Sequence, residues 1–261
     1  MKIGVIGGGN MGGAMARGAV SAGVVTSEEV TVSDPSEAVR ESFRAFDPAI
    51  RTTDDNLSAA AGADIVIVAV KPWLMEQVIG RIAPVIDRER QMVISVAATI
   101  TFEMLETYFG GGKLPPLFRV VPNTAISLGE SATFIASHGA SEAQVGMVRA
   151  LFDPMGKTWL VDESLVGPVT ALASSGIAYA FRYIDAAVRG GEELGIPRSE
   201  ALPIVMQTLR GALAMLEHNG TQPQTEIDKV TTPGGLTLKG LDAMEKNGFA
   251  HAVIEGLKAT K

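Results

Sequence analysis

Residues 3–12 read Ile3-Gly4-Val5-Ile6-Gly7-Gly8-Gly9-Asn10-Met11-Gly12, a short apolar stretch followed at once by glycines. The first four residues are typical of a buried strand, and residues 11–22 have the pattern of a helix. Glycines in this position permit a tight turn and let backbone N–H groups approach a pyrophosphate at the helix N-terminus. A glycine-rich turn without a ligand is the simpler alternative. The order of strand, Gly-x-Gly-x-x-Gly and helix favours a dinucleotide site.

The alternation of strand and helix patterns continues to about residue 160. The segment 65–70 is apolar throughout, as expected for a parallel strand buried on both faces. Strands are expected at 3–6, 30–33, 65–70, 92–96, 118–121, 132–136 and 158–161. Alternating elements of this kind predict an α/β fold with a mostly parallel sheet and helices on both faces.

After residue 161 the strand patterns stop. A long helix is expected from residue 162 to about 193, interrupted at Gly190-Gly191, and Gly195-Ile196-Pro197 marks its end. Further helices are expected at 199–218 and 236–246. The chain therefore divides into a dinucleotide-binding domain, residues 1–161, and an all-helical domain, residues 162–261.

The long helix is apolar around its whole circumference over residues 171–181. Its apolar stretch, 165–181, is short for a membrane span, so we expect a helix buried in protein. Because the helical domain is thin, a partner subunit is expected to supply the missing cover, with burial against the chain's own N-terminal domain as the alternative. The N-terminus lacks the pattern of a signal peptide, so a cytoplasmic protein outside the membrane is expected.

The composition excludes several kinds of chemistry. The 261 residues include no cysteine and three scattered histidines, His138, His218 and His251. Disulfide scaffolds, thiolate metal sites and cysteine nucleophiles are excluded, and no metal site is expected. A hydrophobic share of 46% excludes the disordered and fibrous classes. The net charge of −7 argues against a general affinity for nucleic acid or anionic membranes.

The end of the second strand bears on the choice of cofactor. Asp34 lies where a carboxylate would bind the ribose 2′-hydroxyl and repel the 2′-phosphate of NADPH, which favours NADH. Ser33 as a phosphate partner, with Arg40 or Arg44 turned toward the site, would favour NADPH. Asp34 as a simple helix cap before Pro35 is a third interpretation. Both NADPH and NADH therefore remain open.

Two further segments have the residue types of ligand sites. Lys71, in Val70-Lys71-Pro72, follows a buried strand at the sheet edge where ligands bind, and it is either a ribose or phosphate contact or a solvated lysine. The loop 231–237 combines hydroxyls, two glycines and a helix start, which suits a small carboxylate. A capped turn between two helices is the alternative for this loop.

These segments together resemble the pyrroline-5-carboxylate reductase family, enzymes of the last step of proline biosynthesis, along nearly the whole chain. The matching motifs lie at 6–12, 69–72, 95–101, 119–124 and 228–237. The last of these is the most specific, since Val230-Thr231-Thr232-Pro233-Gly234-Gly235-Leu236-Thr237 is close to the family's Val-[Ser/Thr]-Ser-Pro-Gly-Gly-x-Thr.

The resemblance implies a Rossmann-like NAD(P)-binding domain followed by an all-helical dimerisation domain that interlocks with a second subunit. It implies a homodimer, often assembled into a higher homo-oligomer such as a decamer, with NADPH or NADH as cofactor. The implied cofactor contacts are Gly7, Gly8, Gly9, Asn10, Met11, Gly12, Ser33, Asp34, Asn56, Ala69, Val70, Lys71, Pro72, Ala97 and Asn123. The implied substrate contacts are Glu163, Thr232, Gly235, Leu236 and Thr237.

The implied reaction is hydride transfer to the C=N carbon of 1-pyrroline-5-carboxylate, a cyclic imine carboxylate, which yields L-proline. An iminium accepts hydride readily, so the site mainly needs to align two reactants and exclude water. Thr237 is the candidate catalytic residue, because its hydroxyl is suited to hydrogen-bond the ring nitrogen and help deliver its proton. Glu163 either favours the cationic ring or caps the long helix.

Departures from the family pattern keep other functions open. Ala173-Ser174-Ser175-Gly176-Ile177 stands where the family has Ser-Gly-Ser-Gly-Pro, and Leu236 replaces a frequent Thr or Ala. A divergent reductase of another cyclic imine is therefore one alternative. A β-hydroxyacid dehydrogenase-like enzyme is another, although residues 164–195 lack the lysine that its chemistry needs. A nucleotide-binding regulator without catalysis is the third.

Overall fold

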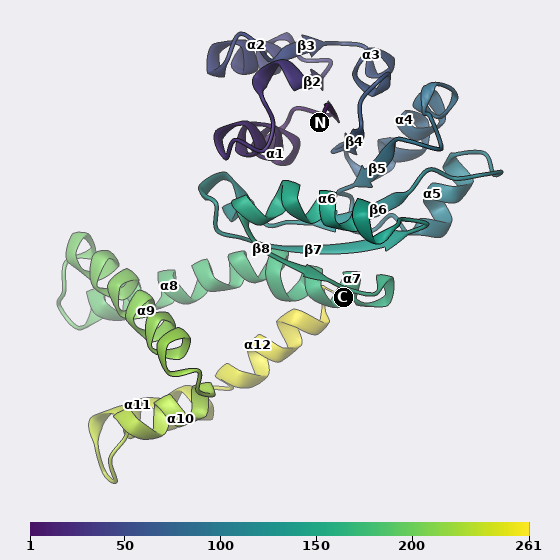
Figure 1. Cartoon of the computed structure of the whole chain (residues 1–261). Helices are drawn as coiled ribbons and strands as arrows, with labels where there is room; N and C mark the ends of the chain where they lie inside the picture. Colours follow the sequence, from purple (N-terminus) through teal and green to yellow (C-terminus); the bar gives the residue numbers. More distant parts are fainter. Residues whose placement is uncertain (261) are drawn as a thin grey trace. The chain divides into compact units, whose positions relative to one another are not determined.

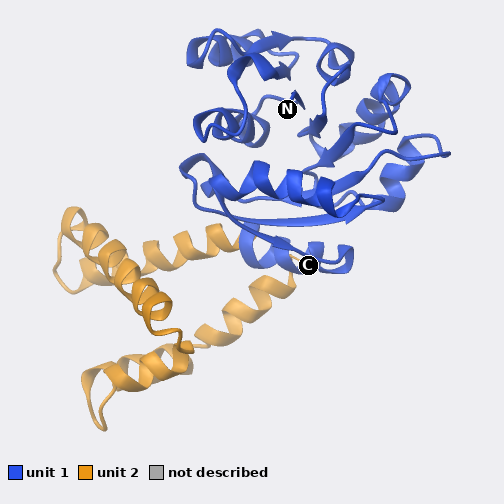
Figure 2. Cartoon of the chain, in the orientation of Figure 1, with its two compact units in different colours: residues 1–174 blue, residues 175–261 orange. Residues whose placement is uncertain are grey.

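The computed structural model describes residues 1–260 and contains two compact units. The first comprises residues 1–174 and the second begins at Ser175 (Figure 2). The first unit is an α/β structure and the second consists of helices.

One sheet forms the centre of the first unit (Figure 1). Its strands within the described residues are β1 (Ile3–Ile6), β2 (Val30–Ser33), β3 (Arg51–Thr53), β4 (Ile65–Val68), β5 (Met92–Ser95), β6 (Leu117–Val121), β7 (Ser131–His138) and β8 (Gly156–Leu160). Their spatial order is β3-β2-β1-β4-β5-β6-β7-β8. The β6–β7 pair is antiparallel and the other neighbouring pairs are parallel. The strand order changes side at β1, because β2 and β3 lie on one side of it and β4 lies on the other. Sheets of this kind bind nucleotides at such a point.

Helices cover both faces of this sheet because successive strand residues point to opposite sides. In β4, Ile65 and Ile67 join one core cluster, while Val66 and Val68 join the other. The first cluster includes side chains of α1 (Asn10–Ser21), α2 (Glu37–Phe46) and α6 (Glu142–Phe152). The second includes side chains of α3 (Asn56–Ala60), α4 (Met75–Ile82) and α5 (Phe102–Tyr108). The predicted α/β class, mostly parallel sheet and two-sided helical cover are confirmed.

Two of the differences between the predicted strands and the structure have a clear physical cause. The strand expected at 65–70 ends at Val68, because after Ala69 donates its N–H to Ile6 O the chain turns into Lys71-Pro72. Strand β3 was not predicted, because Arg51-Thr52-Thr53 is polar and lies at the edge of the sheet.

A short helical segment joins the two units. It consists of the 3₁₀ turn η6 (Glu163–Leu165), α7 (Val166–Val169) and the π-helical η7 (Thr170–Ser175). Val166 is buried in the second core cluster, so this segment packs with the sheet up to Ser174. The division at residue 161 was drawn from where strand patterns stop, and it stays a prediction for the start of the dimerisation domain.

The second unit contains α8 (Gly176–Glu193), α9 (Arg198–Asn219), α10 (Pro223–Val230), α11 (Leu236–Lys246) and α12 (Phe249–Lys258). Helices α8 and α9 lie against each other (Figure 1). The predicted interruption at Gly190-Gly191 is wrong, because α8 runs through both glycines and ends where Gly195 adopts a φ of +92°. Helices α10 and α12 were not predicted.

The second unit leaves large apolar side chains exposed in the single chain. Val188 is buried in α8, whereas Phe181, Leu194 and Leu213 are 65%, 84% and 62% exposed. The expected burial of the long helix is therefore not met within one chain. By length and composition alone, residues 163–193 would also suffice to cross a membrane, but the stretch is divided among 3₁₀, α and π segments.

Candidate active site

The turn between β1 and α1 is shaped by its glycines. Gly7 has a φ of +95°, and a Cβ there would lie 2.7 Å from Ala69 O. A Cβ on Gly12 would lie 1.9 Å from Gly7 O. Gly9 differs, because a Cβ there would meet nothing within 4 Å. The packing of the turn thus requires glycine at positions 7 and 12, whereas position 9 has room for a ligand.

The open position lies at the start of α1. Gly9 is the N-cap of this helix and has no side chain to satisfy the N–H groups of its first turn. Those groups and the helix dipole attract an anion. An open, uncapped helix start behind a glycine turn fits the pyrophosphate of a dinucleotide.

The end of β2 faces this turn. Gly8 donates its N–H to Asp34 Oδ2 at 2.9 Å, and Ser36 donates its N–H to Asp34 Oδ1 at 2.9 Å. Helix α2 has Ser36 as its N-cap, so Asp34 is not the helix cap. The Asp34 carboxylate is instead fixed beside the glycine turn, where the adenosine ribose of a dinucleotide lies in this fold.

A small cavity brings several of the predicted cofactor residues together. It has a volume of about 180 Å³ and is lined by Ile6, Gly7, Ser33, Pro35, Asn56, Val70, Leu74, Gln77, Val78 and Arg81. Ser33 donates its hydroxyl to Asn56 Oδ1 at 2.7 Å, so the two predicted residues are directly linked. Gln77 and Arg81 on α4 were missed, because nothing in the sequence shows that α4 returns to the end of β2.

The remaining predicted cofactor residues lie after β4, β5 and β6. Lys71 is exposed and has extended backbone angles before the 3₁₀ turn η2 (Pro72–Leu74), and Ala97 is 7% exposed after β5. Asn123 follows β6 and is 5% exposed. These positions follow the carboxyl ends of parallel strands, which meet at one edge of the sheet.

The side chain of Asn123 is already engaged within the protein. Its Oδ1 accepts the N–H of Ala125 at 3.0 Å, and its Nδ2 donates to Ala173 O at 3.4 Å. Asn123 therefore caps η4 (Thr124–Leu128) and connects this loop to the π-helical segment. Its expected place near the nicotinamide stays a prediction.

Glu163 takes part in a partly buried polar network rather than capping the long helix. Its Oε1 accepts from Arg119 Nη1 and from Phe102 N, each at 2.7 Å, and Asp162 is the N-cap of η6. Arg119 has a side chain only 6% exposed and also donates to Ala98 O at 2.5 Å. The ion pair with Arg119 partly neutralises the charge of Glu163. The electrostatic stabilisation that Glu163 could give to a cationic substrate is therefore weaker. The sequence motif contained Arg119 but did not reveal its partner.

The loop expected to bind a carboxylate lies between α10 and α11 in the second unit. Gly234 has a φ of +75°, and Gly235 donates its N–H to Thr232 O at 2.8 Å and forms the N-cap of α11. Thr237 is exposed and Leu236 is 85% exposed in the single chain. The loop is thus a closed turn with an open helix start, which combines features of both interpretations.

Comparison with known proteins agrees with this arrangement. A family model described as pyrroline-5-carboxylate reductase dimerisation matches residues 163–261, and one described as coenzyme F420-dependent NADP oxidoreductase matches residues 2–99. Pyrroline-5-carboxylate reductase 2 of Bacillus subtilis is 34% identical over 260 residues, which covers 99% of this chain and 92% of that protein. The chain belongs to the pyrroline-5-carboxylate reductase family.

Solved structures of this family have the same fold. The Plasmodium falciparum pyrroline carboxylate reductase with NADP bound has a TM-score of 0.90 and 26% identity, over 100% of this chain and 95% of that one. The Streptococcus pyogenes 1-pyrroline-5-carboxylate reductase has a TM-score of 0.87 and 30% identity, over 100% and 96%. The predicted Rossmann-like domain and following helical dimerisation domain are therefore confirmed. A 3-hydroxyisobutyrate dehydrogenase of Mycobacterium tuberculosis, at a TM-score of 0.54 and 18% identity over 98% and 92%, shares the fold alone.

Proposed function

We propose that this chain reduces 1-pyrroline-5-carboxylate to L-proline with NADH or NADPH, as an enzyme of proline biosynthesis. The observation that carries the proposal is the family membership along 99% of the chain. The open glycine turn at Gly9 supports it, because the start of α1 fits the pyrophosphate of the cofactor.

The chain's own residues bind and orient the two reactants. The bound cofactor supplies the hydride. The N–H groups at the start of α1 and Lys71 after β4 hold its phosphates, and the loops after β5 and β6 surround its nicotinamide end. These roles for Lys71, Ala97 and Asn123 are part of the proposal.

The loop 231–237 is proposed to hold the substrate. The N–H groups at the start of α11, together with Thr232 and Gly235, bind the carboxylate. The Thr237 hydroxyl holds the proton at the ring nitrogen, so that the imine is cationic when its carbon is reduced. The catalysis then depends on alignment and exclusion of water rather than on a strong acid or base.

We further propose that the chain acts as a homodimer, assembled into a decamer, in the cytoplasm and without a membrane or nucleic-acid partner. The exposed Phe181, Leu213 and Leu236 of the second unit support a partner subunit. The match of residues 163–261 to a dimerisation family supports a second copy as that partner.

The residues at 173–177 favour a related activity as a second candidate function. The departure from the family pattern at 173–177 overlaps the π-helical segment Thr170–Ser175, and π-helical turns are frequent at functional sites. The changed residues in this segment favour a reductase of another cyclic imine carboxylate as the second candidate.

The experiment is an assay of NADH and NADPH oxidation with 1-pyrroline-5-carboxylate and a panel of cyclic imine carboxylates of other ring sizes. The proposal expects turnover with 1-pyrroline-5-carboxylate and formation of L-proline. Turnover with another ring alone would favour the second candidate. Binding of either cofactor without any turnover would contradict both.

A further inference from the structure

Acidic side chains engage the arginines of the helices that follow β2 and β4. These arginines are Arg40 and Arg44 on α2 and Arg81 on α4. Arg81 Nη2 lies 3.1 Å from Asp55 Oδ1, and Arg81 also lines the cavity that contains Ser33 and Asn56. A 2′-phosphate on the adenosine ribose would need such cations as partners.

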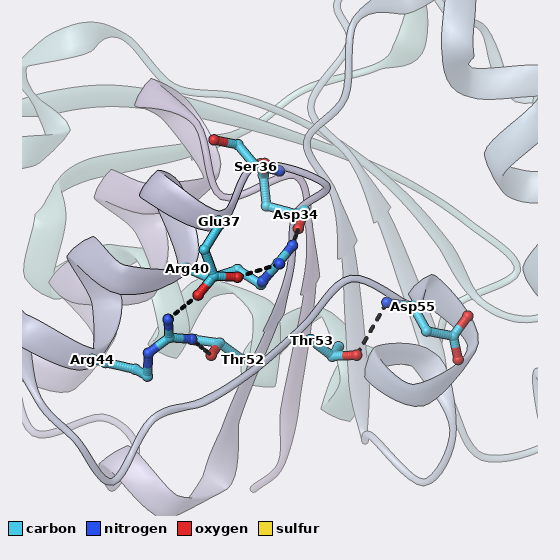
Figure 3. A network of polar contacts seen from close by, with 8 residues as sticks. All are labelled: Asp34, Ser36, Glu37, Arg40, Arg44, Thr52, Thr53 and Asp55. Carbon is cyan, nitrogen blue, oxygen red and sulfur yellow. Dashed lines mark hydrogen bonds and ion pairs between the residues drawn. The ribbon is translucent and has the colours of Figure 1, made fainter.

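Glu37 engages both arginines of α2. Its Oε2 pairs with Arg40 Nη2 and its Oε1 pairs with Arg44 Nη2, so one carboxylate lies between two guanidinium groups (Figure 3). Hydrogen bonds from Arg44 and then Arg40 keep the pKa of Glu37 below its ordinary value, so it is ionised at neutral pH.

The two arginines have further partners that hold them in place. Arg40 Nη1 donates to the backbone oxygen of Asp34 at 2.6 Å, and Arg44 Nη1 donates to Thr52 Oγ1 at 2.9 Å (Figure 3). Arg40 is thus directed at the main chain of Asp34, while the Asp34 carboxylate points to the glycine turn through Gly8. A phosphate at the end of β2 would therefore lie beside the Asp34 carboxylate, while both arginines of α2 are already paired with Glu37.

We propose that this chain prefers NADH to NADPH, and that Glu37 sets the preference together with Asp34 by holding Arg40 and Arg44 in ion pairs. This inference rests on the proposed function only in that a nicotinamide dinucleotide binds at the glycine turn. Asp34 accepts hydrogen bonds from the ribose hydroxyls and repels a 2′-phosphate. Glu37 acts through the arginines and does not touch the cofactor, so it is a positioning residue.

Lys71 does not replace the engaged arginines in this role. It follows β4, and the sheet order places β1 between β4 and β2. Two strand spacings separate the ends of β4 and β2, which is about 10 Å. Lys71 is therefore better placed for the phosphates near the glycine turn than for a 2′-phosphate beside Asp34.

Binding measurements on the full-length protein test the proposal independently of turnover. The dissociation constants of NADH and NADPH are measured by cofactor fluorescence, and those of 5′-AMP and 2′,5′-ADP by competition. The variants are Glu37→Gln, Asp34→Ser and, as a matched control on the same helix, the exposed Glu41→Gln. Circular dichroism monitors folding.

The wild type is expected to bind NADH about tenfold more tightly than NADPH, and 5′-AMP more tightly than 2′,5′-ADP. Glu37→Gln is expected to lower the ratio of the NADPH to the NADH dissociation constant about fivefold, because it frees two cations. Asp34→Ser is expected to lower the same ratio, and Glu41→Gln to leave it unchanged.

A wild type that binds NADPH as tightly as NADH would overturn the proposal. If Glu37→Gln weakens both cofactors equally, or behaves like Glu41→Gln, the role of Glu37 is wrong. If Glu37→Gln fails to fold, Asp34→Ser decides, because an unchanged ratio in that variant overturns the proposed cause of the preference. The 1-pyrroline-5-carboxylate assay on the same preparations tests the proposed function separately, since preferential NADH binding without turnover contradicts that function alone.

Discussion

At the scale of a single residue, Thr237 is the one side chain proposed to contact the reacting ring nitrogen. Its hydroxyl is exposed in the first turn of α11, next to a helix start with open N–H groups. The chain offers no cysteine and three scattered histidines for acid–base work. A cationic imine needs little such help, since a hydroxyl and backbone N–H groups suffice to hold it and its proton.

Thr237→Ala is expected to lower kcat/KM for 1-pyrroline-5-carboxylate about 100-fold, because the hydroxyl that accepts the hydrogen bond from the protonated ring nitrogen is lost. The NADH dissociation constant is expected to stay the same. Steady-state kinetics and cofactor titration check both values, with the exposed Thr225→Ala on α10 as control. Full kcat/KM in Thr237→Ala would remove the hydroxyl from the mechanism.

Glu226 gives a prediction for the dependence of stability on pH. Its Oε1 accepts from Lys229 Nζ at 2.8 Å and from the Thr221 hydroxyl, and these bonds lower the pKa of Glu226 to about 2 from an ordinary value of 4.5. The unfolded chain therefore binds a proton at higher pH than the folded chain, and the resulting stability is present above pH 4.5.

Glu226→Gln is accordingly expected to lower the melting temperature at pH 7. The difference from the wild type should shrink as the pH falls from 4.5 toward 2, where both states become protonated. Thermal unfolding across this pH range measures it, with the exposed Glu245→Gln as control. A difference that grows on acidification would contradict the ion pair.

The residues around Asp34 show which features of the site can be predicted from the sequence. Asp34, Ser33 and Asn56 were predicted from motif position, and the structure brings them to the end of β2. The sequence allows Arg40 and Arg44 as phosphate partners, but only the structure shows that Glu37 engages both. Ion-pair partners depend on side-chain geometry, which the spacing of charges along a helix leaves open.

At the scale of elements, the turn between β1 and α1 contains one glycine needed for packing and one open to a ligand. Gly12 packs against Gly7 O, whereas Gly9 faces open space. The two glycines belong to the same motif, so their different surroundings give opposite expectations for the same substitution.

Gly12→Ala is expected to destabilise the fold by about 1–3 kcal/mol, because its Cβ forces the turn apart. Gly9→Ala is expected to retain the wild-type stability but bind NADH about tenfold more weakly, since its Cβ occupies the cofactor's space. Urea unfolding and cofactor titration measure the two effects. Equal behaviour of the two variants would count against the placement of the phosphates.

The elements that the sequence predicted are those with strong patterns. Segments 65–70 and 92–96 are apolar because both faces are buried, so their strands were recognised. Strand β3 is polar and three residues long, and α10 and α12 are short helices of eight and ten residues. Gly190-Gly191 stays helical because tertiary context overrides a weak propensity.

At the scale of the whole molecule, the second unit leaves apolar side chains exposed, which the proposed partner subunit would cover. Phe181 on α8 and Leu213 on α9 are more than half exposed in one chain. The sequence alone predicts a thin helical domain, but only the placed helices show which apolar side chains stay exposed.

The double variant Phe181→Asp, Leu213→Asp is expected to shift the protein from dimer or higher oligomer toward monomer and to lower its melting temperature, because two charges would enter an apolar interface. Sedimentation velocity measures the assembly. Val85→Asp, on the sheet unit, is the control for an exposed apolar residue outside this surface. An unchanged assembly in the double variant would place the interface elsewhere.

The central claim is that the chain reduces 1-pyrroline-5-carboxylate with a nicotinamide cofactor bound at the glycine turn. The most direct test measures kcat/KM for this substrate with NADH and with NADPH, together with the amount of L-proline formed per cofactor oxidised. We expect one L-proline per cofactor and a higher kcat/KM with NADH. Cofactor binding without formation of L-proline from either cofactor would contradict the claim.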